Sequence, residues 1–256
     1  MSNLLEGKLA LVLGIANKWS LAYAIADAFS REGATLVLTY LGERQKRSIG
    51  ELSAGMNTAG ILPCDVTKDE ELGALTESLR ALGRPLDAVV HSLAFANPED
   101  LRRPFLETSR AGFALALDVS AYSLVAVARA TAPLMTRGGS ISTLTYLGAT
   151  RVVQNYNVMG VAKASLEAAV RYLASELGAS GIRVNAISAG PVKTASARAI
   201  KDFSSILEVI AQRAPLRRNT EPSEVGDTAV FLASDLGRGV TANTLFVDSG
   251  MQVMGF

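Results

Sequence analysis

The chain has very little of the chemistry that disulfides and metal centres need. It carries one cysteine, Cys64, and one histidine, His91, among 256 residues. A single cysteine excludes an intrachain disulfide and a thiolate-rich metal site, and it is typical of a reducing compartment. We therefore expect a cytoplasmic protein with no bound metal, in which His91 and Cys64 are buried core residues.

An excess of either charge and a long apolar run are lacking as well. The 25 Lys and Arg residues nearly balance the 24 Asp and Glu residues, which leaves a net charge of +1. This balance gives no overall field that would attract nucleic acid or an anionic membrane. No uninterrupted apolar run approaches the ~20 residues that cross a bilayer as a helix, and no basic segment precedes Leu9–Ala16 as in a signal peptide. We expect no nucleic-acid binding and no membrane insertion.

What the chain does contain is a regular alternation of short apolar runs and longer segments of helical periodicity. Apolar residues make up 49% of the sequence, enough to fill a sizeable core. The apolar runs predict strands at Leu9–Leu13, Thr35–Thr39, Gly60–Cys64, Ala88–Ser92, Ser140–Thr145, Arg183–Ser188 and Leu245–Val247. The segments between them predict helices at Ser20–Arg31, Glu43–Ala54, Asp69–Ala81, Ala111–Met135, Asn155–Gly178 and Pro222–Ser234.

Strands that are apolar throughout and separated by helices are typical of a parallel sheet covered on both faces. Because crossovers between parallel strands are right-handed, we expect an α/β fold, a Rossmann-type doubly wound parallel sheet with helices on both faces. No repeat, low-complexity tract or linker divides the sequence, so residues 1–256 are expected to form a single domain. The long segments Ala94–Thr108 and Ala189–Ala214 should lie beyond the carboxyl ends of the strands, where ligands of such sheets bind.

A candidate nucleotide-binding turn follows the first expected strand. Gly14 would let the backbone approach a pyrophosphate. Ser20 could cap the next helix, whose free N–H groups in the first turn would face the anion. The turn lacks the G-x-G-x-x-G pattern, so on its own it fits an ordinary strand-to-helix connection better. Trp19, within the turn, is expected to serve packing. Asp65, after the third strand, could accept a hydrogen bond from adenine or cap the following helix.

The end of the second expected strand bears on the choice of nicotinamide cofactor. Leu41 and Gly42 stand where an acidic residue commonly holds the ribose 2′-hydroxyl of NAD. Arg44, Lys46 and Arg47 follow at helical spacing, where they could meet a 2′-phosphate or form a solvated face. Because Leu41 and Gly42 offer no direct clamp for a phosphate, we expect NADH rather than NADPH.

Tyr156 and Lys163 form the candidate chemical pair. They stand seven residues apart in a segment of helical periodicity, which would place them on one helix face, roughly 10 Å apart along its axis. A phenol can donate a hydrogen bond to a developing oxyanion, and a neighbouring ammonium can hold cofactor hydroxyls and favour phenolate character. Tyrosine and lysine are common residues, so the pair alone also fits a helix without catalytic function.

In their order and spacing, these pieces resemble the bacterial enoyl-(acyl-carrier-protein) reductases of the short-chain dehydrogenase/reductase superfamily over nearly the whole chain. The stretches that carry the resemblance are Gly14-x5-Ser20-Leu21-Ala22-Tyr23, Arg31-Glu32-Gly33-Ala34, Thr39-Tyr40, Cys64-Asp65-Val66, His91-Ser92, Tyr146-Leu147-Gly148-Ala149, Asn155-Tyr156-Asn157-Val158-Met159-Gly160, Ala162-Lys163-Ala164-Ser165-Leu166-Glu167, Arg183-Val184-Asn185-Ala186-Ile187-Ser188-Ala189-Gly190-Pro191 and Val247-Asp248-Ser249-Gly250. The wider superfamily uses Tyr-x3-Lys with a preceding serine to act on carbonyls and alcohols. Here Met159 stands four residues before Lys163, and the Tyr-x6-Lys spacing is that of the enoyl reductases.

The resemblance implies reduction of the C=C bond of a trans-2-enoyl thioester in fatty-acid synthesis. NADH would deliver hydride to the β-carbon, Tyr156 would stabilise the enolate through the thioester oxygen, and Lys163 would bind the nicotinamide ribose. Tyr146 matches a second tyrosine of the family's active site, and Ala96 would lie against the acyl substrate. The implied cofactor-binding residues are Gly14, Ser20, Leu21, Leu41, Asp65, Val66, Leu93, Lys163, Val192, Lys193, Thr194, Ala195 and Ser196.

The resemblance also implies a lid, a partner and an assembly. Residues from about 192 to 214 would form a mobile substrate lid, and acyl-carrier protein carrying enoyl chains would be the partner. The chain would form a homotetramer through the helices expected at 111–135 and 155–178. Many members have glycine in place of Ala94, and some carry basic residues for the carrier protein where Ser204 and Ser205 stand here.

Two other functions stay open at this point. A short-chain carbonyl reductase or alcohol dehydrogenase would share the fold, although Met159 argues against it. A non-catalytic dinucleotide sensor would share it too, since a fold alone does not determine function. Tyr156 and Lys163 argue against the sensor, because a sensor needs no proton donor beside the nicotinamide.

Overall fold

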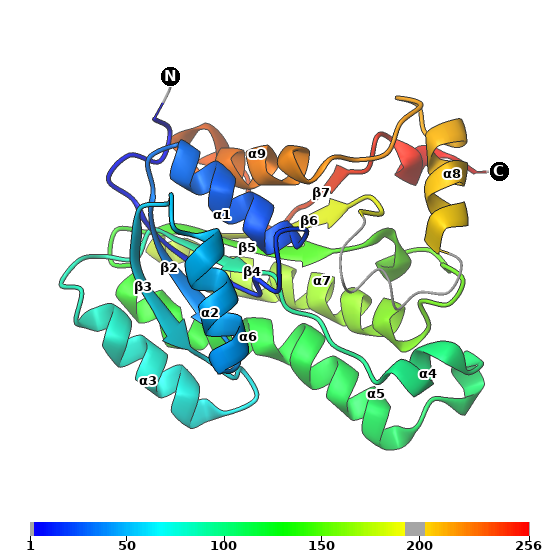
Figure 1. Ribbon diagram of the computed structural model, residues 1–256, viewed down its shortest axis with the longest axis horizontal. Coiled ribbons are helices and arrows are strands. Elements are labelled where there is room, and N and C mark those ends of the chain that lie inside the picture. Colours follow the sequence, from blue (N-terminus) through cyan, green and yellow to red (C-terminus); the bar gives the residue numbers. More distant parts are fainter. Residues whose placement is uncertain (1–2, 193–202, 256) are drawn as a thin grey trace.

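The computed structural model describes residues 3–192 and 203–255, whose strands form one parallel sheet with helices on both faces (Figure 1). The strands are β1 (Leu9–Leu13), β2 (Thr35–Tyr40), β3 (Thr58–Pro63), β4 (Ala88–His91), β5 (Gly139–Thr145), β6 (Ile182–Ala189) and β7 (Thr244–Val247). Their spatial order is β3-β2-β1-β4-β5-β6-β7, and each neighbouring pair is parallel. The expected doubly wound Rossmann-type sheet is confirmed, and its strand order reverses between β1 and β4.

Two apolar cores cover the two faces of the sheet. The helices are α1 (Leu21–Arg31), α2 (Glu43–Leu52), α3 (Asp69–Arg80), α4 (Pro98–Arg102), α5 (Arg110–Leu117), α6 (Ser123–Thr131), α7 (Val158–Leu177), α8 (Phe203–Arg213) and α9 (Pro222–Ala233). Ala10 and Val12 of β1 join one core with residues of α1 and α9. Leu9, Leu11 and Leu13 point the other way and join α3, α6 and α7. Figure 1 shows α1 and α9 on one side of the sheet and α3 and α6 on the other.

The long helix expected at 111–135 is divided into parts. α5 ends at Leu117, one turn of π-helix follows at Asp118–Tyr122, and α6 begins at Ser123. Within the described ranges, the helical stretch Arg110–Leu134 is the one long and apolar enough to cross a membrane by length and composition. Half of its most apolar window is buried inside the molecule, and core helices pass the same test. Length and composition therefore do not separate a core helix from a span here.

The helix expected at 155–178 begins later than its periodicity suggests. α7 starts at Val158, and Asn155 and Asn157 have left-handed backbone φ angles of 63° and 43°. Asparagine tolerates such angles better than most residues, but a right-handed helix cannot continue through them. Tyr156 therefore lies in the turn before α7, and the expectation that Tyr156 and Lys163 share one helix face is wrong.

His91 and Cys64 are buried, as their positions in apolar strands predict. His91 is fully enclosed at the end of β4, with Nδ1 2.9 Å from Thr143 Oγ1 and Nε2 2.8 Å from Ser123 Oγ. Burial, with the nearby charge of Lys163, lowers the pKa of His91 to about 3. Burial raises the pKa of the Cys64 thiol to about 12, so this thiol is unreactive at neutral pH.

The protein should lose stability as the pH falls from 7 to 5, because of His91. The unfolded imidazole, with an ordinary pKa of 6.5, takes up a proton in this range, whereas the folded one stays neutral. This proton uptake lowers the free energy of unfolding by about 2 kcal/mol. His91 is the one histidine of the chain, so His91→Gln should remove most of this pH dependence. Urea unfolding of the wild type and of His91→Gln at pH 7 and pH 5 measures this dependence. An equal loss of unfolding free energy in the two proteins would contradict the prediction.

Candidate active site

The carboxyl ends of β1 and β4 meet where the strand order reverses, the place where ligands of such sheets bind. Gly14, directly after β1, has a φ of 100°, and a Cβ there would lie 2.0 Å from the backbone oxygen of Ser92. Ser20 caps α1, since its Oγ accepts a hydrogen bond from the backbone N–H of Tyr23. The bare backbone at Gly14 and the N–H groups from Leu21 onward fit the pyrophosphate of a dinucleotide.

Gly14→Ala should disturb both the fold and this cradle. The new methyl group would overlap the Ser92 carbonyl, and alanine is strained at this φ. Gly42→Ala is the matched control, because Gly42 has a φ of 128° and no atom within 4 Å of the Cβ position. In urea unfolding we expect Gly14→Ala to cost about 1–3 kcal/mol more than the control, the usual range for overpacking. Equal losses of unfolding free energy in the two variants would show that the space between Gly14 and Ser92 can accept a methyl group.

Other residues implied for cofactor binding lie at the same edge of the sheet. Leu41 follows β2 and is largely exposed, and its backbone N–H donates to Gln45 Oε1 at 2.8 Å. Asp65 follows β3, and hydrogen bonds from the Thr67 hydroxyl and backbone N–H lower the pKa of its carboxyl. Asp65 does not cap α3, whose first residue follows Lys68. Its carboxylate is ionised at neutral pH and can accept a further hydrogen bond.

The remaining residues implied for cofactor binding lie partly at other strand ends and partly outside the described residues. Val66, Leu93 and Val192 are partly buried just beyond β3, β4 and β6. Trp19 is half exposed, with the Lys18 ammonium 4.9 Å from the ring centroid. The other implied residues lie outside the described residues: Lys193, Thr194, Ala195 and Ser196.

Two tyrosines meet at the carboxyl end of β5. Tyr146 directly follows β5, and its ring meets that of Tyr156 edge-on, with centroids 5.0 Å apart and planes at 68°. Burial raises the pKa of both phenols, that of Tyr146 to about 12 with a further rise from the charge of Asp248. The expected phenolate character of Tyr156 is wrong, because burial disfavours the charged form. Both phenols stay protonated at neutral pH and can donate hydrogen bonds.

Lys163 lies in α7 and is buried against the same strand end. Its Nζ donates to the backbone oxygen of Leu144 at 2.7 Å, and burial lowers its pKa to about 8 against the opposing effect of the Glu167 carboxylate. Glu167 follows one turn later, and its Oε1 accepts a hydrogen bond from Thr145 Oγ1 at 2.8 Å. Lys163 and Glu167 are thus held by consecutive residues of β5 directly before Tyr146. At pH 7 the lysine is mainly an ammonium.

An apolar cluster lies beside the tyrosines. Ala96 is buried in it with Val158, Met159 and Ala162 of α7, and the partly buried Tyr156 packs against it. The position four residues before Lys163 is therefore a buried thioether, which cannot donate a proton. This cluster gives the site an apolar surface next to a hydrogen-bond donor, which fits an acyl chain attached to a polar head.

A family model described as Enoyl-(Acyl carrier protein) reductase matches residues 14–252, nearly the whole chain. The chain belongs to this family. The NADH enoyl-acyl-carrier-protein reductase FabI of Bacillus cereus is 56% identical over 254 residues, covering 98% of this chain and 99% of that protein. The Staphylococcus aureus (strain MRSA252) FabI, named for NADPH, is 50% identical over 252 residues and covers 98% of both chains.

The solved structures give the same family. The Bacillus cereus enoyl-acyl carrier protein reductase, crystallised with NADP+ and indole naphthyridinone, superimposes with a TM-score of 0.98 at 55% identity over 100% of both chains. The enzyme of Aquifex aeolicus superimposes with a TM-score of 0.95 at 45% identity over 99% of both chains. The fold described above is therefore that of the enoyl reductase family along its whole length.

The sequence patterns considered above did not single out several residues of this enoyl reductase site. A Cβ at Gly148 would lie 2.4 Å from Tyr156 Cδ1, and one at Gly160 would lie 2.8 Å from the Gly148 backbone oxygen. The tyrosine ring thus packs directly on bare backbone. Glu167 could have been found from its four-residue spacing to Lys163, which places both on one helix face. Asn157 had no local signal, because its partners are distant in the sequence.

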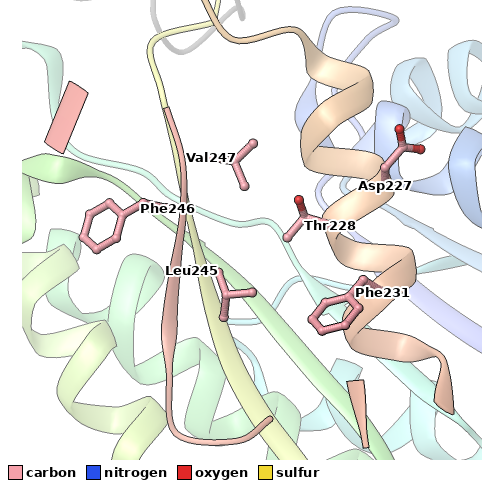
Figure 2. A pocket seen from close by; sticks show the side chains of 6 residues that line it. All are labelled: Asp227, Thr228, Phe231, Leu245, Phe246 and Val247. Atoms are coloured by element: carbon pink, nitrogen blue, oxygen red, sulfur yellow. The ribbon is translucent and has the colours of Figure 1, made fainter. Parts of the chain in front are cut away.

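One cavity of the enoyl reductase chain lies beside Tyr156, and another lies away from the implied site residues. The first, of about 420 Å³, is lined by Tyr156 and Asn157 together with Phe105 and residues of 148–164. The second, of about 490 Å³, lies between α9 and β7, where Leu245 and Val247 point toward α9 and Phe246 points away (Figure 2). It contains none of the implied site residues. Among residues 3–192 and 203–255, no three His, Cys, Asp or Glu side chains gather as a metal site.

Proposed function

We propose that the chain is an enoyl-acyl-carrier-protein reductase of fatty-acid synthesis that reduces the C=C bond of trans-2-enoyl thioesters with NADH. The observation that carries the proposal is the pair of protonated tyrosines, Tyr146 and Tyr156, beside the buried Lys163 at the end of β5. The apolar cluster around Ala96 supports an acyl substrate, and the buried Met159 argues against a carbonyl reductase.

Tyr156 is the residue that stabilises negative charge on the substrate. When bound, NADH supplies the hydride that adds to the β-carbon. The electron pair of the C=C bond then moves toward the thioester oxygen, where the Tyr156 hydroxyl donates a hydrogen bond to the developing enolate. The thioester carbonyl then re-forms as the α-carbon takes up a proton from water, which completes the saturated thioester. Tyr146 supports the Tyr156 ring through their edge-on contact.

Lys163 and the strand ends hold the cofactor in this proposal. The ammonium has three donors, of which one is used by the Leu144 oxygen, and the other two have no acceptor in the described part of the chain and can bind the hydroxyls of the nicotinamide ribose. The backbone from Gly14 to Leu21 receives the pyrophosphate. The remaining contacts come from Leu41, Asp65, Val66, Leu93 and residues 192–196.

NADH is proposed over NADPH from the end of β2. Neither Leu41 nor Gly42 has a charged side chain to pair with a 2′-phosphate, and Lys46 already lies 3.8 Å from Glu43 and 5.5 Å from the centroid of the Tyr40 ring. The relatives are named for either cofactor, NADH in Bacillus cereus and NADPH in Staphylococcus aureus. The ratio of kcat/KM for the two cofactors therefore has to be measured on this chain.

We further propose that the chain works as a single cytoplasmic domain in a homotetramer and receives its substrate from acyl-carrier protein, without inserting into a membrane. Exposed apolar side chains on the two long helices support a helix-to-helix interface: Leu115, Tyr122, Val161 and Tyr172. The lid of residues 192–214 includes α8, which stands at the carboxyl ends of β6 and β7 in Figure 1. Size-exclusion chromatography with light scattering tests the assembly.

The decisive experiment follows the absorbance of the reduced nicotinamide with purified protein. NADH or NADPH is combined with a trans-2-enoyl thioester or with a 3-oxoacyl thioester. The proposal expects cofactor oxidation with the enoyl substrate alone, and faster oxidation of NADH. Oxidation with the 3-oxoacyl substrate alone would establish a carbonyl reductase instead. Cofactor binding without turnover of either substrate would favour a dinucleotide sensor.

A further inference from the structure

Asn157 ties the turn that carries Tyr156 to the segment around α4. Its Nδ2 donates hydrogen bonds to the backbone oxygens of Leu101 at 3.0 Å and Arg103 at 2.8 Å, which lie 56 and 54 residues away in sequence. A carboxamide nitrogen has two hydrogens, so this bridge uses both donors. The end of α4 and the start of α7 are therefore fixed to each other by one side chain.

The bridge takes the place of an ordinary helix cap. Asn157 stands at the N-cap position of α7, where an asparagine side chain usually accepts a hydrogen bond from the first helical turn. Here it makes no side-chain capping bond, and its backbone has φ 43° and ψ −124°. Backbone strain persists only where the surroundings hold it in place. The side-chain bonds to Leu101 and Arg103, together with the hydrogen bond from Gly160 N–H to the Asn157 backbone oxygen, surround this residue.

The residue held by this arrangement is Tyr156. It stands between Asn155 and Asn157, both with positive φ, and its ring packs in the apolar cluster that contains Ala96 and Leu101. Leu101 thus contacts the cluster through its side chain and Asn157 through its carbonyl oxygen. A shift of the α4 segment would move the tyrosine and the apolar surface relative to each other.

We propose that Asn157 is a positioning residue, which sets the place of the Tyr156 hydroxyl relative to the acyl-binding surface around Ala96. This inference rests on the proposed function, in which Tyr156 donates a hydrogen bond to the substrate oxygen. Asn157 lines the cavity beside Tyr156, but both of its amide hydrogens are taken by Leu101 and Arg103, so its side chain has no donor left for the substrate. Its effect reaches the reaction through the geometry of Tyr156, and a misplacement of about 1 Å can cost a hundredfold in rate.

Asn157→Gly deletes the carboxamide while still permitting a positive φ. Asn155→Gly is the matched control, because Asn155 is the other neighbour of Tyr156, also has a positive φ, and makes no side-chain hydrogen bond to the described residues. We expect Asn157→Gly to lower kcat about 10- to 100-fold, with the NADH dissociation constant unchanged, and Asn155→Gly to leave kcat near wild type. Asn157→Asp keeps the shape but loses both donors, so it should not restore the rate.

A double-mutant cycle separates positioning from general damage to the fold. If Asn157 acts through the Tyr156 hydroxyl, Asn157→Gly should cause little further loss of kcat in a Tyr156→Phe background. An undiminished loss in that background, or equal rates for Asn157→Gly and Asn155→Gly, would overturn the inference. Failure of the proposed function is read separately, from the substrate that the wild-type protein reduces. If that substrate were a 3-oxoacyl thioester, the same cycle on it would still decide the role of Asn157.

Discussion

Tyr156→Phe should lower kcat by about 10²- to 10³-fold, the usual effect of removing one preorganised donor to an oxyanion. Phenylalanine keeps the ring and its edge-on contact with Tyr146, so the packing of the site should survive. Only the hydroxyl that donates to the thioester oxygen is lost. Stopped-flow measurement of cofactor oxidation with a trans-2-enoyl thioester gives kcat, and fluorescence titration with NADH gives the dissociation constant, which should not change.

Tyr172→Phe is the control for this experiment, because Tyr172 is 80% exposed on α7, lies outside the site, and keeps in phenylalanine the ring that the proposed helix-to-helix interface uses. It should match the wild type in both measurements. Wild-type activity in Tyr156→Phe would remove Tyr156 from the mechanism. A parallel loss of NADH binding would mean that the hydroxyl holds the cofactor rather than the substrate oxygen.

Lys163→Met should weaken NADH binding by about 10- to 100-fold. A hydrogen bond from a charged group contributes about 1.5–3 kcal/mol, and each 1.4 kcal/mol corresponds to a factor of ten in affinity. Methionine preserves much of the volume of the buried lysine stem but removes every donor. Fluorescence titration with NADH at pH 7 measures the effect. Lys8→Met provides the control, because Lys8 pairs with Asp235 and precedes β1, away from the carboxyl ends of the strands.

The pH dependence of NADH affinity gives a second test of Lys163. Burial holds the pKa of Lys163 at about 8, so the ammonium is present below that pH and is lost as the pH rises through it. Wild-type affinity should therefore fall between pH 7 and pH 9, whereas the affinity of Lys163→Met should be nearly constant. A flat wild-type profile would mean that the ammonium does not contact the bound cofactor.

The fold could be predicted from the sequence because the pattern that predicts it is repeated along the chain. Several strands are apolar on both faces, as at Leu9–Leu13, where alternate side chains enter opposite cores. A misjudged boundary, such as the start of β3 at Thr58 rather than Gly60, leaves such a pattern intact. The prediction of a doubly wound parallel sheet therefore did not depend on any single residue.

The geometry of the site was harder to predict, because it depends on contacts between segments that are distant in the sequence. The start of α7 is displaced by the backbone of Asn155 and Asn157, and Asn157 is held by carbonyl oxygens of the α4 segment. Helical periodicity carries no information about such partners. The protonation of Tyr156 was misjudged for a similar reason, since burial is a property of the packed site and not of the local sequence.

The two glycines against Tyr156 limit how this active site can evolve. With Gly148 directly under the ring and Gly160 against the Gly148 carbonyl, even one added methyl group at either position would displace the tyrosine or its support. Both positions are closed to diversification while Tyr156 remains the donor. New substrate or inhibitor preferences must then arise at other positions of the site, where the tyrosine ring does not rest on bare backbone.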